Sequence, residues 1–140
     1  MKVKFCYKEY QFKLSMDAAR KFEQDTGKDL LVVLMSYLEC FHTASGGLEM
    51  SRALKLRSLH SEDTAARMFH ALFKAGGESV DVQEVADAMY RVQWRPVGDD
   101  ASDMYEPWTY TAVLMASQVD KQLMEVAKSK KAERLGGAGE

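Results

Sequence analysis

The sequence lacks a long apolar run and has few cysteines. Its longest apolar stretch, Leu30 to Met35, is far shorter than the roughly 20 residues that a bilayer-spanning helix needs, and the N-terminal residues do not resemble a signal peptide. We therefore expect a cytoplasmic protein. The two cysteines, Cys6 and Cys40, are too few for a disulfide framework, so both thiols should be reduced and partly buried.

Histidines and catalytic motifs are also scarce. Of the three histidines, His42, His60 and His70, only His42 has a nearby candidate metal ligand, Cys40. Structural zinc normally requires two such short-range pairs, so we predict no metal site. The sequence also lacks a nucleophile elbow, a phosphate-binding loop and an HExxH zinc motif. We predict no enzymatic activity and no cofactor, although a catalytic cleft assembled by the fold would not be visible at this level.

Charge of one sign is not in large excess, since the net charge is −2. This balance argues against broad electrostatic capture of nucleic acid, and an acidic helix start with Asp81, Glu84 and Asp87 would repel phosphates in a helix-turn-helix arrangement. The stretch from Lys121 to Arg134 is locally basic. It is either a solubilising segment or a nucleic-acid contact, and the former is the more common role.

An acidic segment follows Pro96 and raises the question of calcium binding. Its carboxylates are Asp99, Asp100, Asp103 and Glu106. Both the ligand spacing of a calcium loop and the glycine at its sixth position are missing. We interpret the segment as a solvated loop before a final helix that has Pro107 at its first position.

What is present is the composition of one globular domain. The chain has 140 residues, of which 46% are hydrophobic and 29% charged. A chain of this length buries roughly two thirds of its unfolded surface on folding. We therefore predict a single domain over residues 1–127, followed by a flexible, basic and glycine-rich tail over residues 128–140.

The periodicity of apolar residues predicts a mainly α fold: a compact helical domain of about five helices with a short N-terminal β-hairpin. Residues 3–14 alternate between apolar and polar, which is typical of a hairpin, and we place its turn near Lys8-Glu9. Helical spacing follows from residue 16 onward. The expected helix starts are marked by Ser15, Asp29, Ser61 and Asp81, and Gly27 and Gly76-Gly77 mark two expected helix ends.

A candidate protein-contact patch lies near the start of the final predicted helix. Aromatic residues contribute strongly to interface energies, and methionines adapt to different partners. The nine methionines of this chain are many for its length, although most should fill the core. The candidate contact residues are Tyr105, Trp108, Tyr110 and Met115. The alternative is that Trp108 simply anchors the last helix in the core.

The order of these elements resembles the tail assembly chaperones of long-tailed bacteriophages (siphovirus type) and related gene-transfer particles. The likeness covers about residues 7 to 93. It is carried by a strand, a capped helix with its glycine end, and the later capped helices that begin near Ser61 and Asp81. The strand and first-helix residues are Tyr10, Phe12, Leu14, Ser15-Met16, Phe22-Glu23, Gly27 and Leu30.

This resemblance implies a protein of the bacterial host cytoplasm that is absent from the mature virion. It would bind the tape measure protein and recruit tail tube subunits during tail morphogenesis, without catalysis. The family also implies a longer frameshifted form, for which Lys130-Lys131 is the candidate junction. A homo-oligomer is also possible because the segment from Leu30 to Phe41 is very apolar. The alternative function is a small helical DNA-binding regulator.

Overall fold

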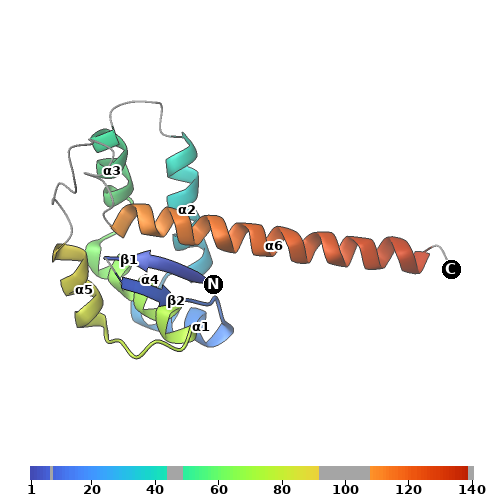
Figure 1. Ribbon diagram of the computed structural model, residues 1–140, viewed down its shortest axis with the longest axis horizontal. Helices are drawn as coiled ribbons and strands as arrows, with labels where there is room; N and C mark the ends of the chain where they lie inside the picture. The colour runs from blue at the N-terminus through green and yellow to red at the C-terminus, as the bar shows by residue number, and fades with distance from the viewer. Residues whose placement is uncertain (7, 44–48, 92–107, 139–140) are drawn as a thin grey trace.

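The computed structural model describes residues 1–6, 8–43, 49–91 and 108–138. Within them a two-stranded antiparallel sheet is followed by helices, which confirms the mainly α fold with an N-terminal hairpin (Figure 1). The described part contains six helices rather than about five. The elements are β1 (Lys2–Phe5), β2 (Lys8–Gln11), α1 (Met16–Thr26), α2 (Leu30–Thr43), α3 (Glu49–Ser58), α4 (Glu62–Ala75), α5 (Val82–Arg91) and α6 (Trp108–Ala138).

The hairpin turns two residues earlier than the sequence suggested. Phe5 pairs with Lys8, so the chain turns between these two residues, and Lys8-Glu9 belongs to β2. Two-residue hairpin turns need residues with positive φ, for which asparagine or glycine is the usual signal. Here Cys6 adopts φ 50° instead, and this non-glycine turn gave no recognisable pattern in the sequence.

The helix caps follow local chemistry, and the predicted caps are confirmed. The hydroxyl of Ser15 accepts a hydrogen bond from the Ala18 amide at the start of α1, and Gly27 ends that helix in the left-handed region. Asp29 and Asp81 accept hydrogen bonds from backbone amides in the first turns of α2 and α5. Ser61 does the same for α4. These side chains satisfy amides that have no partner within the helix.

Helix α4 forms the centre of the core. Its buried side chains face the hairpin on one side and α6 on the other, and Phe69 links the two because its ring lies 4.8 Å from Phe5 and 6.2 Å from Trp108. Phe73 extends the aromatic cluster toward Tyr10, with ring centroids 4.6 Å apart. This packing supplies the helical support that an isolated hairpin lacks.

The chain after β2 runs against the C-terminal end of α4. The amide of Lys13 donates to the carbonyl of Leu72 at 3.1 Å, which ties the two segments together. At Gly76 the approach is so close that an added Cβ would lie 2.5 Å from the carbonyl oxygen of Gln11. Glycine is therefore needed here for space, since its φ is an ordinary −76°.

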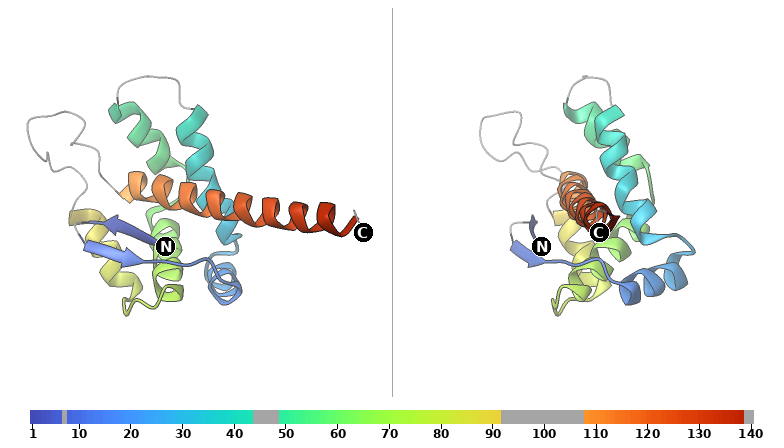
Figure 2. Two further views of the ribbon diagram at one scale, coloured as in Figure 1. Left: turned by 45° about the vertical axis from the view of Figure 1, so that its right-hand side comes forward. Right: turned by 90° about the vertical axis from the view of Figure 1, so that its right-hand side faces the viewer.

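Helix α6 packs on the body with its first half and projects from it with its second half (Figures 1 and 2). The first half covers α2 and also contacts β1 and α3. Gln118 donates its side-chain amide to the carbonyl of Lys2 at 2.9 Å, and Thr111 donates to that of Lys4. These bonds satisfy carbonyls of the hairpin's edge strand.

The predicted start of the tail, residue 128, lies within helix α6. Helix α6 continues through Lys128 to Ala138, so the helix does not end where a flexible segment was expected. Residues 121–134 are all exposed. We call residues 121–134 the arm. Its sequence is rich in lysine, alanine and glutamate, which are good helix formers, and this explains helical geometry without tertiary contacts.

Candidate functional site

The structure divides the four predicted contact residues. Trp108 and Met115 are only 1% and 0% exposed, and Tyr110 is 40% exposed. Trp108 and Met115 therefore belong to the core and do not form an exposed patch with Tyr110, which corrects the expectation and favours the anchoring role for Trp108. Tyr105 lies outside the described residues.

The sequence singled out residues 121–134, the arm, for their basic charge, but it did not show that apolar side chains of the arm are exposed. The apolar stripe of α6 that packs on the body includes Ala112, Ala116 and Val119, all buried. Leu123 and Val126 continue the same spacing of three and four residues, but they are 43% and 47% exposed. A stripe that is buried against the body thus continues past the body onto an uncovered helix. We call Leu123 and Val126 the apolar face of the arm.

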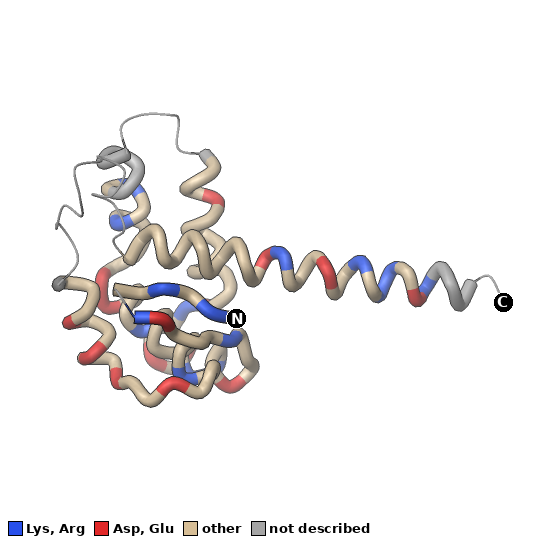
Figure 3. The backbone as a smooth tube through the Cα atoms, in the orientation of Figure 1, with Lys and Arg blue, Asp and Glu red and all other residues tan. Residues whose placement is uncertain are grey.

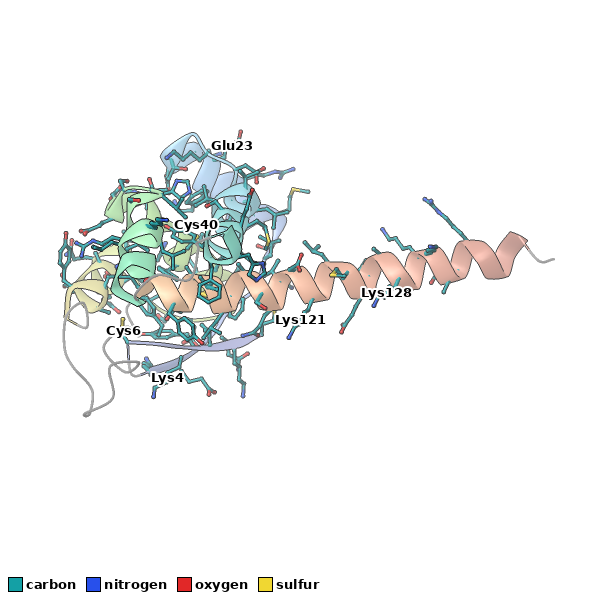
Figure 4. The ribbon with its side chains drawn as sticks, turned by 90° about the horizontal axis from the view of Figure 1, so that it is seen from above. Lys4, Cys6, Glu23, Cys40, Lys121 and Lys128 are labelled. Carbon is teal, nitrogen blue, oxygen red and sulfur yellow. The ribbon has the colours of Figure 1, made fainter. Side chains whose placement is uncertain are left out.

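The opposite side of the arm is basic. Lys121, Met124, Lys128 and Lys131 are spaced by three, four and three residues, which places them on one ridge. All are exposed, and Met124 is the exposed apolar member. Figure 3 shows basic residues along the arm, and Figure 4 labels Lys121 near the body and Lys128 farther out. We call these four residues the basic ridge.

A buried polar cluster lies between α2, the start of α4 and α6. The rings of Tyr37 and His60 are 5.7 Å apart, and those of Tyr37 and Trp108 are 6.1 Å apart. Three atoms of this cluster lack a hydrogen-bond partner among the described residues: Tyr37 Oη, His60 Nδ1 and Trp108 Nε1. Each such atom costs about 1–3 kcal/mol, so the cluster is a weak point of the core.

Ser36 and His60 form a contact that superficially resembles an activated nucleophile. Ser36 Oγ lies 2.9 Å from His60 Nε2, but the hydroxyl also donates to the carbonyl of Val33. A hydroxyl proton directed at Val33 is not directed at His60 Nε2, and the tautomer of the ring decides which atom of the pair donates. No carboxylate contacts the other ring nitrogen within the described residues. The pair is therefore arranged for structure rather than for nucleophilic catalysis.

The environments of two histidines disfavour their charged forms. Burial, with a smaller effect from Lys28, lowers the pKa of His60. Burial also lowers the pKa of His70, whose ring donates to the carbonyl of Val80 at 3.1 Å. Both rings are therefore neutral at physiological pH. Among the described residues, no group of three or more His, Cys, Asp or Glu side chains is placed to hold a metal ion.

The two cysteines are half-buried, and neither forms a disulfide, as expected. Figure 4 shows Cys6 by the hairpin and Cys40 on α2. Burial raises the pKa of the Cys6 thiol to about 12, so this thiol is protonated and unreactive at neutral pH.

A groove of about 340 Å³ lies between α1 and α4. Charges of both signs line it, and they pair with one another: Asp25 lies 3.8 Å from Lys21 Nζ and 3.9 Å from Arg67 Nη1. Arg67 also donates to Asp63 at 3.0 Å. This mutual neutralisation does not favour a ligand of either charge.

Tyr37→Phe is expected to stabilise the protein. The substitution removes a buried hydroxyl that has no partner among the described residues and keeps the ring contacts, so the free energy of unfolding should rise by about 1 kcal/mol. Urea denaturation measures the change. Tyr90→Phe is the matched control, because its exposed hydroxyl donates to Glu62 and its removal should lower stability slightly. A loss of stability in Tyr37→Phe would contradict the prediction.

Comparisons with protein-family models, curated proteins and solved structures found no match. Within the described residues, no helix combines the length and apolar character needed to cross a membrane. Any functional assignment therefore depends on the chain's own pattern and geometry.

Proposed function

We propose that this protein is a phage tail assembly chaperone that binds the tape measure protein and recruits tail tube subunits during tail morphogenesis. The observation that carries the proposal is the apolar face of the arm, where Leu123 and Val126 remain exposed on a helix that projects from the body. A second support is the order of the strand and the capped helices through residue 91, which resembles that of tail assembly chaperones.

The apolar face suits a helical client. A tape measure protein is long and helical, and its apolar stripes must be covered before tail assembly. Two helices that present apolar residues at a spacing of three and four residues pack along their length and exclude water from both stripes. In this proposal, the apolar face of the arm covers one such stripe, and the body stays folded around α4. The proposed sites of action are the host cytoplasm and the assembling tail, not the mature virion.

The proposal is tested by co-expressing the chain with candidate tape measure and tail tube proteins from the same genome and measuring the complex on gel filtration. Leu123→Asp/Val126→Asp should weaken tape measure binding by at least about tenfold, because the substitutions remove two apolar side chains that would be buried against the tape measure protein. Gln122→Asp/Ser129→Asp is the matched control, since it adds the same charge to exposed polar positions of the arm. Equal binding by both variants, or no complex with the wild-type chain, would count against the chaperone function.

One observation favours the alternative, a DNA-binding regulator. The arm carries five basic and two acidic residues, and an exposed basic helix can contact phosphates. Against this, Asp81, Glu84 and Asp87 are all exposed at the start of α5, the helix that would enter the major groove in a helix-turn-helix arrangement. A salt-dependent gel shift of duplex DNA at physiological ionic strength would support the regulator.

A further inference from the structure

Within the described residues, no ion pair joins Lys121, Lys128 or Lys131 of the basic ridge to an acidic side chain. The arm points away from the body, and α5 lies at the opposite end of the molecule (Figure 1 and Figure 2, left). An isolated helix of this length is only marginally stable in water, so a partner along the arm would stabilise it. The ridge faces away from the apolar face, so it can be occupied independently of a client there.

The exposed side of α5 has the complementary chemistry. Asp81, Glu84, Asp87 and Tyr90 are spaced by three residues, and all four are exposed. Figure 3 marks the acidic positions of α5 in red. We call these four residues the acidic ridge. Basic side chains on one surface and carboxylates on the other steer two surfaces together and fix their relative orientation.

The two ridges also match in length and order. The basic ridge spans eleven residues and the acidic ridge ten, and their end residues are about 15 Å and 14 Å apart along the helix axis. In an antiparallel arrangement offset by one ridge position, Met124 lies opposite Tyr90, Lys128 opposite Asp87 and Lys131 opposite Glu84. Lys121 and Asp81 then lie beyond the paired positions. The contact of a methionine sulfur with an aromatic ring adds a favourable apolar component to the ion pairs.

We propose that the arm of one molecule docks on α5 of a second copy of the same chain, basic ridge against acidic ridge. Because the two surfaces are different and lie at opposite ends of the molecule, the association is head-to-tail and leaves a free arm at one end and a free α5 at the other. Two arms do not pair through their basic ridges, because like charges would face one another. This inference does not depend on the proposed function.

The experiment is sedimentation velocity on the whole chain over a range of concentrations. Wild-type protein should associate at low ionic strength and dissociate toward monomer as salt is raised, since exposed ion pairs are screened. Two charge-reversed variants follow. Lys128→Glu/Lys131→Glu changes the arm, and Glu84→Lys/Asp87→Lys changes α5 while leaving the Asp81 cap intact. Each alone should associate at least about tenfold more weakly than wild type.

Mixing the two variants is the decisive measurement. Each variant carries the same charge on both of its ridges and repels itself, whereas a mixture brings opposite ridges together in both directions. The mixture should therefore regain association, and circular dichroism should show that each variant keeps its fold. Glu23→Lys on α1, labelled in Figure 4, is the control for a charge change elsewhere and should associate like wild type.

Three results would overturn the inference. They are a wild-type chain that stays monomeric at low salt and high concentration, folded variants that associate as strongly as wild type, and a mixture that does not regain association. Loss of association in Leu123→Asp/Val126→Asp alone, with both charge-reversed variants unaffected, would show that copies pair through the apolar face instead.

Discussion

Trp108→Ala is expected to lower the free energy of unfolding by about 3–5 kcal/mol, the usual range for removing a large buried aromatic side chain. Trp108 is among the largest fully buried side chains of the described residues, and its ring contacts both Tyr37 on α2 and Phe69 on α4. The substitution would leave a cavity where three helices meet. Since a small domain is stabilised by only about 5–15 kcal/mol, the loss is a large share of the total.

Thermal and urea denaturation measure this effect, and neighbouring residues on α6 provide the controls. Leu114→Ala removes an exposed apolar side chain of the same helix and should change stability by less than about 0.5 kcal/mol. Trp108→Phe should cost less than the alanine variant because it keeps an aromatic ring and removes the unpaired Nε1 donor. If Trp108 instead served as a surface contact residue, Trp108→Ala would leave stability nearly unchanged.

Gly76→Ala is expected to destabilise the protein by about 3 kcal/mol through overpacking. The new Cβ would lie 2.5 Å from the Gln11 carbonyl oxygen and 2.7 Å from the Phe12 Cα, and both are backbone atoms that cannot rotate away. Relief would require the chain after β2 to move away from α4, which would weaken the hydrogen bond between the Lys13 amide and the Leu72 carbonyl. Denaturation midpoints would show the loss directly.

Gly27→Ala is the matched control for this substitution. Gly27 has a left-handed φ of 73°, but a Cβ there would meet nothing within 4 Å. Its replacement should therefore cost only the conformational strain of about 1 kcal/mol. A Gly27→Ala variant that is as unstable as Gly76→Ala would show that backbone conformation, rather than the close approach, limits the Gly76 position.

Patterns that depend on neighbours in the chain were predictable from the sequence. The caps at Ser15, Asp29, Ser61 and Asp81 were found because a side chain and the amides that it accepts from lie within three residues of each other. The left-handed end of α1 was found because glycine carries that conformation at little cost. The turn of the hairpin was misplaced by two residues because Cys6 has a positive φ, which is not expected from a cysteine.

The candidate site was only partly predictable, for a related reason. Sequence reasoning selected aromatic residues near the start of α6, yet burial there depends on which helices pack on that segment. Trp108 and Met115 became core because the first half of α6 packs on α2, β1 and α3, while Leu123 and Val126 stayed exposed because the body ends before the arm. The apolar stripe that includes all of these positions was visible in the sequence. The residue of α6 at which the body stops packing on that stripe was not.

The sequence by itself determined the helices, most of their ends and the presence of a hairpin, because hydrogen bonds and periodicity within a few residues decide these features. Only the tertiary structure decided the close approach at Gly76, the unpaired polar atoms around Tyr37 and the separation of α6 into a buried half and an arm. Each of these features depends on contacts between segments that are distant in the chain. Local sequence patterns do not predict such contacts.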